Sequence, residues 1–140
     1  MIRLLWLALF LALPWHAALA SKIVVTVEGL RSDRGQVMVA IFSKPKGFPD
    51  GNYADQYARR PASTAPVIVV FDGLPPGRYA LGAYHDENGN GRLDTNFFGW
   101  PTEGYALSNG IRLSLYRPRF SEAAVTLDER DLAITLHIGY

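Results

Sequence analysis

Oxygen-bearing side chains recur at short intervals in the stretch 85–96, which reads HDENGNGRLDTN. Counted from Asp86, they occupy the first, third, fifth and ninth positions, and a glycine occupies the sixth. Carboxylate and amide oxygens at alternate positions around a glycine turn are typical of calcium-binding loops, in which the seventh residue gives its backbone carbonyl. The stretch therefore predicts a calcium site. Its candidate ligands are Asp86, Asn88, Asn90, Arg92 (through its carbonyl) and Asp94.

The twelfth position of the same loop departs from that pattern. Phe97 stands where a calcium loop of the EF-hand type has a bidentate Glu, so Glu103 is the residue that could complete the ligand shell. With two or three carboxylates we expect weak binding, with a dissociation constant of about 10⁻⁴ to 10⁻³ M. A loop without metal is the alternative, because Asn and Asp side chains also accept hydrogen bonds from backbone N–H groups two residues on. Both interpretations stay open.

Aromatic side chains crowd the next part of the chain, residues 97–105, and three arginines follow. The residues are Phe97, Phe98, Trp100, Tyr105, Arg112, Arg117 and Arg119. Aromatic rings beside polar groups can stack on a carbohydrate or another small molecule of the cell envelope, which is one interpretation of this loop. The other is that the rings cap the open end of the fold.

The sequence gives little support for a nucleophilic catalytic site or for a zinc site. Ser108 and His85 with Asp86 or Glu103 could be drawn as a hydrolase triad, but no G-x-S-x-G turn surrounds the serine. Zinc requires a cluster of His, Cys or carboxylate ligands, and His137 belongs to a different predicted strand from His85. We therefore expect a protein without enzymatic activity.

The elements that must position these residues read as strands. Apolar and β-branched residues alternate in six segments separated by Gly, Pro and polar turns. The predicted strands are 22–30, 36–43, 66–74, 78–86, 122–129 and 132–140. Short polar connections predict two hairpins, one from the first two strands and one from the last two. Residues 52–60 could form a turn or two of helix.

This pattern predicts an all-β fold, a single antiparallel β-sandwich of the prealbumin-like or immunoglobulin-like kind. Two connections, 44–65 and 87–121, are longer than ordinary turns, and long loops in a compact domain are often functional.

The first twenty residues have the layout of a secretory signal peptide. One early charge, Arg3, precedes an apolar run, and Ala18–Leu19–Ala20 provides small residues at an A-x-A cleavage site. The apolar run is too short for a membrane anchor that spans the bilayer. We expect cleavage after Ala20, a mature domain of residues 21–140, and a periplasmic or secreted location. The sequence has no cysteine, so no disulfide staples the domain.

Charge excludes one further class of protein. Cleavage removes one basic residue, Arg3, and leaves equal numbers of basic and acidic residues in 21–140. A nucleic-acid binder needs a basic face, so we do not expect nucleic acid as a partner. No segment of the mature chain is long and apolar enough to be a predicted transmembrane helix. The expected partner is an envelope or extracellular ligand whose identity the sequence does not give.

Three stretches taken together resemble the DUF2141 family, a group of uncharacterised bacterial secreted proteins. They are VEGLRSDRGQVMVAIF, FDGLPPGRYALGAYHDENGNGRLDTNFFGWPTEGYALSN and PRFSEAAVTL. The segment GLPPGRYALGAYHDENGNG is also similar to Cna-B-type and other prealbumin-like modules, in which a strand ends in an Asp/Asn loop. The resemblance implies an exported β-sandwich and covers about residues 22–140. It implies no reaction and no catalytic residues.

Overall fold

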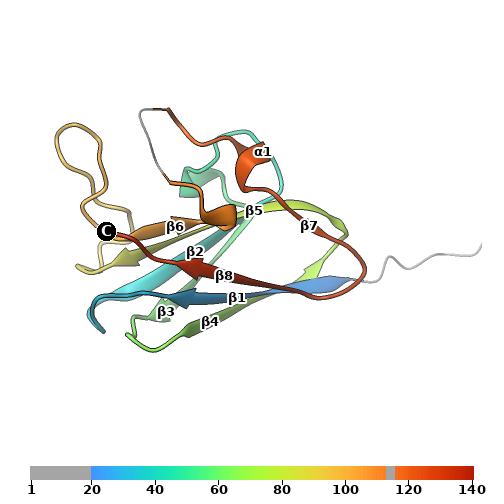
Figure 1. The fold of residues 1–140 in the computed structure, drawn as a ribbon, viewed down its shortest axis with the longest axis horizontal. Coiled ribbons are helices and arrows are strands. Elements are labelled where there is room, and N and C mark those ends of the chain that lie inside the picture. The colour runs from blue at the N-terminus through green and yellow to red at the C-terminus, as the bar shows by residue number, and fades with distance from the viewer. Residues whose placement is uncertain (1–19, 113–115) are drawn as a thin grey trace, which may run out of the picture.

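Two β-sheets packed face to face form the fold, which confirms the predicted all-β sandwich (Figure 1). The computed structural model describes residues 20–112 and 116–140. Its strands are β1 (Ser21–Glu28), β2 (Gln36–Phe42), β3 (Gln56–Pro61), β4 (Val67–Leu74), β5 (Gly77–Asp86), β6 (Tyr105–Leu107), β7 (Val125–Leu127) and β8 (Leu132–His137). Three short helices complete it: η1 (Gly51–Tyr53), η2 (Ser108–Gly110) and α1 (Phe120–Ala123). The predicted signal peptide lies, apart from Ala20, outside the described residues and stays a prediction.

The two sheets divide the strands in an order that the sequence pattern does not reveal. One sheet has the order β4-β1-β8, and the other has the order β3-β2-β5-β6 with β7 also paired to β5. Both predicted hairpins are therefore wrong, because β1 and β2 lie in different sheets, as do β7 and β8. The pairing of β1 with β8 is parallel, so the sandwich is antiparallel except at this one pair of described strands.

The main core lies between the sheets and follows the alternation of the strands. Every second residue of β1 is buried, β4 of the same sheet adds buried apolar side chains beside it, and β2 and β5 of the other sheet face them. Its fully buried members include Ile23, Val25, Val27, Val37, Val39, Ile41, Val69 and Leu81. Strand β5 contributes Tyr79, Leu81 and Ala83 to this core, and His85 of the same face is buried too. Removal of this apolar surface from water is the main stabilising contribution to the fold.

A second cluster lies beneath the long connection between β2 and β3. Phe48 from this connection packs edge-on against Phe42 of β2 and Phe120 of α1, with ring centroids 5.1 and 6.1 Å apart. The predicted helical turns at 52–60 are only partly present. Helix η1 is a single turn, and β3 begins at Gln56. Helix α1 also replaces the start of the strand predicted at 122–129.

Within the described residues, no helix has the length and apolar character needed to cross a membrane. Two long connections, one between β2 and β3 and one between β5 and β6, extend beyond the strands of the β3-β2-β5-β6 sheet.

Candidate functional site

The base of the β5–β6 loop is organised around the buried carboxylate of Asp86. One oxygen accepts the backbone N–H of Asn90 (3.0 Å), and the other accepts the N–H of Gly91 (2.8 Å) and the side-chain amide of Gln36 (2.5 Å). Asp86 ends strand β5 and is fully shielded from solvent. Such bonds to a charged acceptor are among the stronger hydrogen bonds in proteins. Asp86 therefore closes the turn upon itself.

The other oxygen-bearing side chains of the stretch converge on Asp94. The side-chain amides of Asn88 and Asn90 donate to its two oxygens at 2.5 and 2.8 Å, and the guanidinium of Arg92 lies 3.7 Å from one of them. These hydrogen bonds, that from Asn90 first, lower the pKa of the Asp94 carboxyl. The structure therefore brings together the side chains of Asn88, Asn90 and Asp94, which the sequence predicts as candidate ligands.

Glu103 joins the two ends of this loop. One of its oxygens accepts the N–H of Glu87 (2.8 Å) and the other accepts the N–H of Asp94 (3.0 Å). Glu103 is buried, and it contacts backbone rather than the Asn side chains. Its position near the candidate ligands agrees with the sequence, but its role as a clamp between Glu87 and Asp94 could not be read from spacing.

The donor atoms match a calcium ion only in part. The nitrogens of the Asn88 and Asn90 amides face Asp94, so their oxygens would have to turn before they could bind a cation. The oxygens instead accept the backbone N–H groups of Asn90 and Arg92, the local turns expected of a loop without metal. Among the described residues, no group of three or more His, Cys, Asp or Glu could hold a metal ion. Amide and carbonyl oxygens would therefore have to supply most of the ligands of any calcium bound here.

Ser108 and His85, two residues of the hydrolase triad considered from the sequence, make hydrogen bonds to other partners. Ser108 is buried, donates to the carbonyl of Ala123 (2.6 Å) and accepts the N–H of Leu81 (2.9 Å). His85 is buried as well, with Nε2 2.7 Å from the carbonyl of Arg34 and Nδ1 2.6 Å from the hydroxyl of Tyr140. Both side chains hold backbone and neighbouring elements together.

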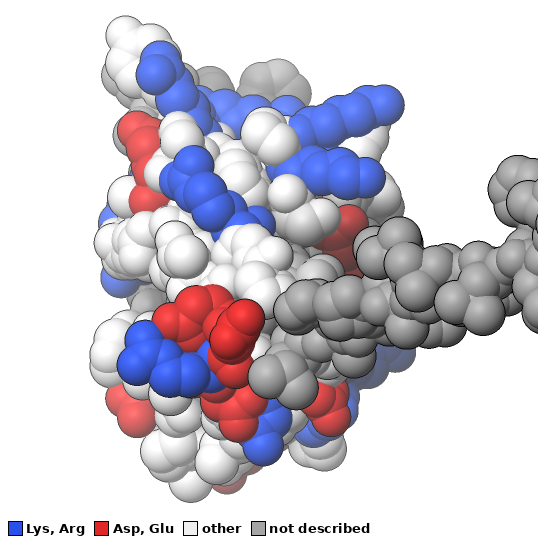
Figure 2. Space-filling view, turned by 90° about the vertical axis from the view of Figure 1, so that its right-hand side faces the viewer, with Lys and Arg blue, Asp and Glu red and all other residues white. Residues whose placement is uncertain are grey.

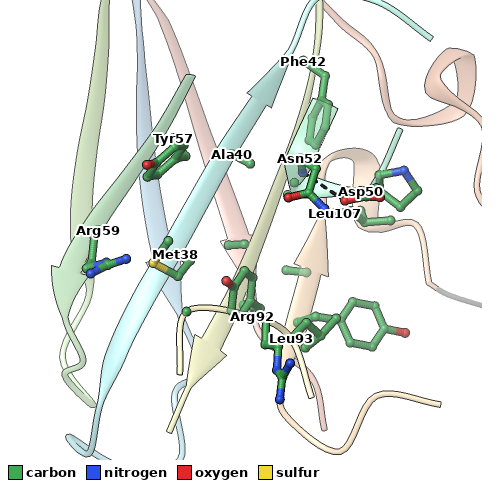
Figure 3. Close-up of a pocket in the computed structure, with 18 residues that line it drawn as sticks. Met38, Ala40, Phe42, Asp50, Asn52, Tyr57, Arg59, Arg92, Leu93 and Leu107 are labelled. Atoms are coloured by element: carbon green, nitrogen blue, oxygen red, sulfur yellow. Dashed lines mark hydrogen bonds between the residues drawn. The ribbon is translucent and has the colours of Figure 1, made fainter. Parts of the chain in front are cut away.

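A groove of about 520 Å³ runs over the outer face of the β3-β2-β5-β6 sheet (Figure 3). Its floor is low because two small residues, Ala40 and Gly82, stand opposite each other in the centre of the sheet. Strand register places Tyr57 on one side of this pair and Leu107 on the other. A Cβ added at Gly82 would meet the side chain of Leu107 at 3.2 Å, closer than ordinary van der Waals contact, so a larger residue here would displace Leu107.

Aromatic and polar side chains surround that floor. Strand register forms a neighbouring row of Arg59, Met38, Tyr84 and Tyr105. The rims come from both long connections: Asp50 and Asn52 stand at one end of the groove, and Arg92 and Leu93 stand at another (Figure 3). The volume falls within the range of about 300 to 1,000 Å³ that is usual for small-molecule sites.

Tyr84 contributes a hydrogen-bond donor to the groove. Burial raises the pKa of its hydroxyl to about 12, and the carboxylates of Asp86 and Glu103 act in the same direction. The hydroxyl therefore stays protonated at physiological pH and can donate a hydrogen bond. The sequence pattern did not identify Tyr84 or Tyr57 as groove residues. Alternation with buried neighbours marks Tyr84 as outward-facing, whereas β3 has no buried residue to mark Tyr57, and no sequence signal shows that small residues lie between the two rings.

The aromatic residues of 97–105 separate into two groups. Tyr105 lines the groove, whereas Phe97 and Phe98 are 96% and 81% exposed, so these two rings do not cap the sandwich. The arginines separate too. Arg112 lies over the ring of Tyr105, while Arg117 and Arg119 surround a second hollow together with Arg78.

Comparison with known proteins gives one match. The model of the DUF2141 family, described as an uncharacterized protein conserved in bacteria, matches residues 25–135. No curated protein and no solved structure matches the chain.

Proposed function

The chain belongs to the DUF2141 family, and we propose that it is an exported, non-enzymatic domain that binds a carbohydrate or a similar small polar molecule. The observation that carries the proposal is the groove on the outer face of the β3-β2-β5-β6 sheet. The solvent-facing side of an antiparallel sheet normally carries polar side chains. Here the centre of the sheet carries Ala40 and Gly82, and the bulk stands around them.

The chemistry of the groove suits a sugar. Tyr57 is 69% exposed, so one ring is available for the apolar face of a pyranose. Asn52, Arg59 and the protonated hydroxyl of Tyr84 supply donors and acceptors for sugar hydroxyls. A mainly apolar groove with a few convergent polar groups is the usual form of a small-ligand site.

The test is a titration with neutral oligosaccharides. We would follow binding of chitotetraose and of maltotetraose by saturation-transfer NMR. Tyr57→Ala should weaken binding by up to about tenfold, because it removes one stacking surface. Ala40→Phe should abolish binding, because it fills the floor. The proposal would be overturned if neither sugar bound the native protein. It would also be overturned if both variants bound the sugars as tightly as the native protein does.

The matched control lies on the other sheet. Ile68 of β4 is 59% exposed on the outer face of the β4-β1-β8 sheet, away from the groove. Ile68→Ala removes a similar exposed apolar side chain and should leave the titration unchanged. A decrease equal to that of Tyr57→Ala would point to non-specific adsorption.

A second candidate role is a weak structural calcium site in the 86–94 loop. The convergence of Asn88 and Asn90 on Asp94 favours it, since a cation would need these side chains in one place. Calcium bound to the native state should raise stability by about 1.4 kcal/mol at free calcium tenfold above the dissociation constant. Thermal melts in millimolar calcium and in chelator measure this, and identical melting temperatures would exclude the site.

A further inference from the structure

A tight turn at residues 96–101 carries aromatic rings into solvent. The N–H of Asn96 donates to the carbonyl of Trp100 (2.8 Å), and the side-chain oxygen of Asn96 accepts the N–H groups of Phe98 (2.9 Å) and Trp100 (3.1 Å). Gly99 takes a positive φ of 83°, which the turn requires. The tip is therefore held in shape before any partner arrives.

The rings on this turn are apolar and adjacent. Phe97 and Phe98 contact each other edge to face with centroids 5.5 Å apart, and Trp100 is 42% exposed beside them. Residues 96–101 contain no charged side chain. Exposed apolar clusters of this kind mark an interaction site.

The shape of the turn favours a lipid surface over a protein. A stable protein interface buries about 800 Å² on each partner and involves about 20 residues or more. A six-residue turn that rises from the sheet on a long loop offers much less (Figure 1). Phe and Trp side chains are instead well suited to the boundary between lipid headgroups and acyl chains.

Basic residues stand toward the same edge of the molecule. Arg78, Arg117 and Arg119 line one hollow next to helix α1, and no described ion pair joins any of them to a carboxylate. In Figure 1 both α1 and the β5–β6 loop lie toward the top of the molecule, α1 near the centre and the loop at the left. Figure 2 looks from the right-hand side of that view and shows Lys and Arg gathered at the top of the face that it presents. Anionic lipid headgroups are complementary to such a cluster.

We propose that this edge docks on an anionic lipid surface, with Phe97 and Phe98 entering the interface and the three arginines contacting headgroup phosphates. This docking does not depend on the groove: the β5–β6 loop contributes Arg92 and Leu93 to the groove, but neither Phe97 nor Phe98 lines it.

Vesicle flotation tests the proposal on residues 21–140, which contain both sheets and both apolar clusters. Trp100 is the single tryptophan of this segment, so its emission should shift to the blue when vesicles containing phosphatidylglycerol are added. Phe97→Ser with Phe98→Ser should lower vesicle affinity by at least about tenfold per ring. Arg78→Gln with Arg119→Gln should weaken binding about fivefold per arginine and only on anionic vesicles.

Two comparisons complete the experiment. Tyr53→Ser with Tyr57→Ser removes exposed aromatic rings elsewhere and should leave flotation unchanged. Melting temperatures of all variants show that each is folded. Absence of flotation on both phosphatidylcholine and phosphatidylglycerol vesicles, or flotation that persists without Phe97 and Phe98, would overturn the proposal.

Discussion

The base and the tip of the β5–β6 loop distribute their side chains in opposite ways. At the base, the carboxylates of Asp86 and Glu103 are buried and accept backbone N–H groups. At the tip, Phe97 and Phe98 are exposed. A loop of this kind has too little apolar material to fold by burial, so charged acceptors hold its backbone. The apolar side chains are then free to face a partner, and stability and recognition fall on different residues.

The largest effect that would test this separation is expected at Asp86. Asp86→Ala removes a buried carboxylate that accepts the N–H groups of Asn90 and Gly91 and the side-chain amide of Gln36. We expect the free energy of unfolding to fall by about 3 kcal/mol. Urea denaturation measures it, with Glu129→Ala as the exposed acidic control. Equal stability of the two variants would show that the base does not hold the loop.

Glu103 should give a smaller loss. Glu103→Gln keeps one acceptor oxygen for Glu87 or Asp94 but turns an amide nitrogen toward the other N–H. The expected decrease in unfolding free energy is about 1 to 2 kcal/mol. Hydrogen exchange at the amides of Glu87 and Asp94 should become faster. Unchanged protection at both amides would contradict the clamp.

Low pH should destabilise the base of the β5–β6 loop by protonating Asp94. Its folded pKa is lowered from the ordinary value of 3.8, chiefly by the hydrogen bond from Asn90, so its contribution to stability is present above that value. The contribution is lost as pH falls through the folded pKa. The melting temperatures of the native protein and of Asp94→Asn should be measured from about pH 6 downward. They should converge at pH values below the ordinary pKa of an Asp carboxyl. A constant difference across the series would assign no such role to Asp94.

The smallest effect on stability is expected at the tip. Phe97→Ser with Phe98→Ser removes rings that are almost fully exposed, so the free energy of unfolding should change by less than about 0.5 kcal/mol. The same urea denaturation checks it. A loss as large as that of Glu103→Gln would mean that the rings pack against the domain in solution, and the contrast between base and tip would fail.

Much of the fold follows from residue alternation. The β-branched residues of 22–30 correctly predicted β1, in which Ile23, Val25 and Val27 are buried at every second position. Alternation assigns a face but names no partner, so both hairpins were wrong. Strand β3 escaped prediction because it is a polar, mostly exposed edge strand over Gln56–Pro61. Its residues show no apolar face to recognise.

The candidate sites were predictable to different degrees. The Asp/Asn pattern correctly located a closed loop, because local spacing determines which side chains can meet within one turn. The groove was not predictable, because it depends on Ala40 and Gly82 meeting across two strands that are far apart in sequence. Exposure of Phe97 and Phe98 was also hidden, since an aromatic residue in a loop can face the core or solvent. Calcium binding and export stay predictions.

The parallel pairing of β1 with β8 has a consequence for how the protein is made. The first strand of the domain hydrogen-bonds to its last, across residues 23–28 and 132–137. A chain that emerges from a ribosome or a membrane channel with its N-terminus first holds β1 with one open edge until β8 follows. Such distant contacts form late and slowly. This sheet therefore closes only after β8 has emerged, and β1 and β4 wait for their third strand until then.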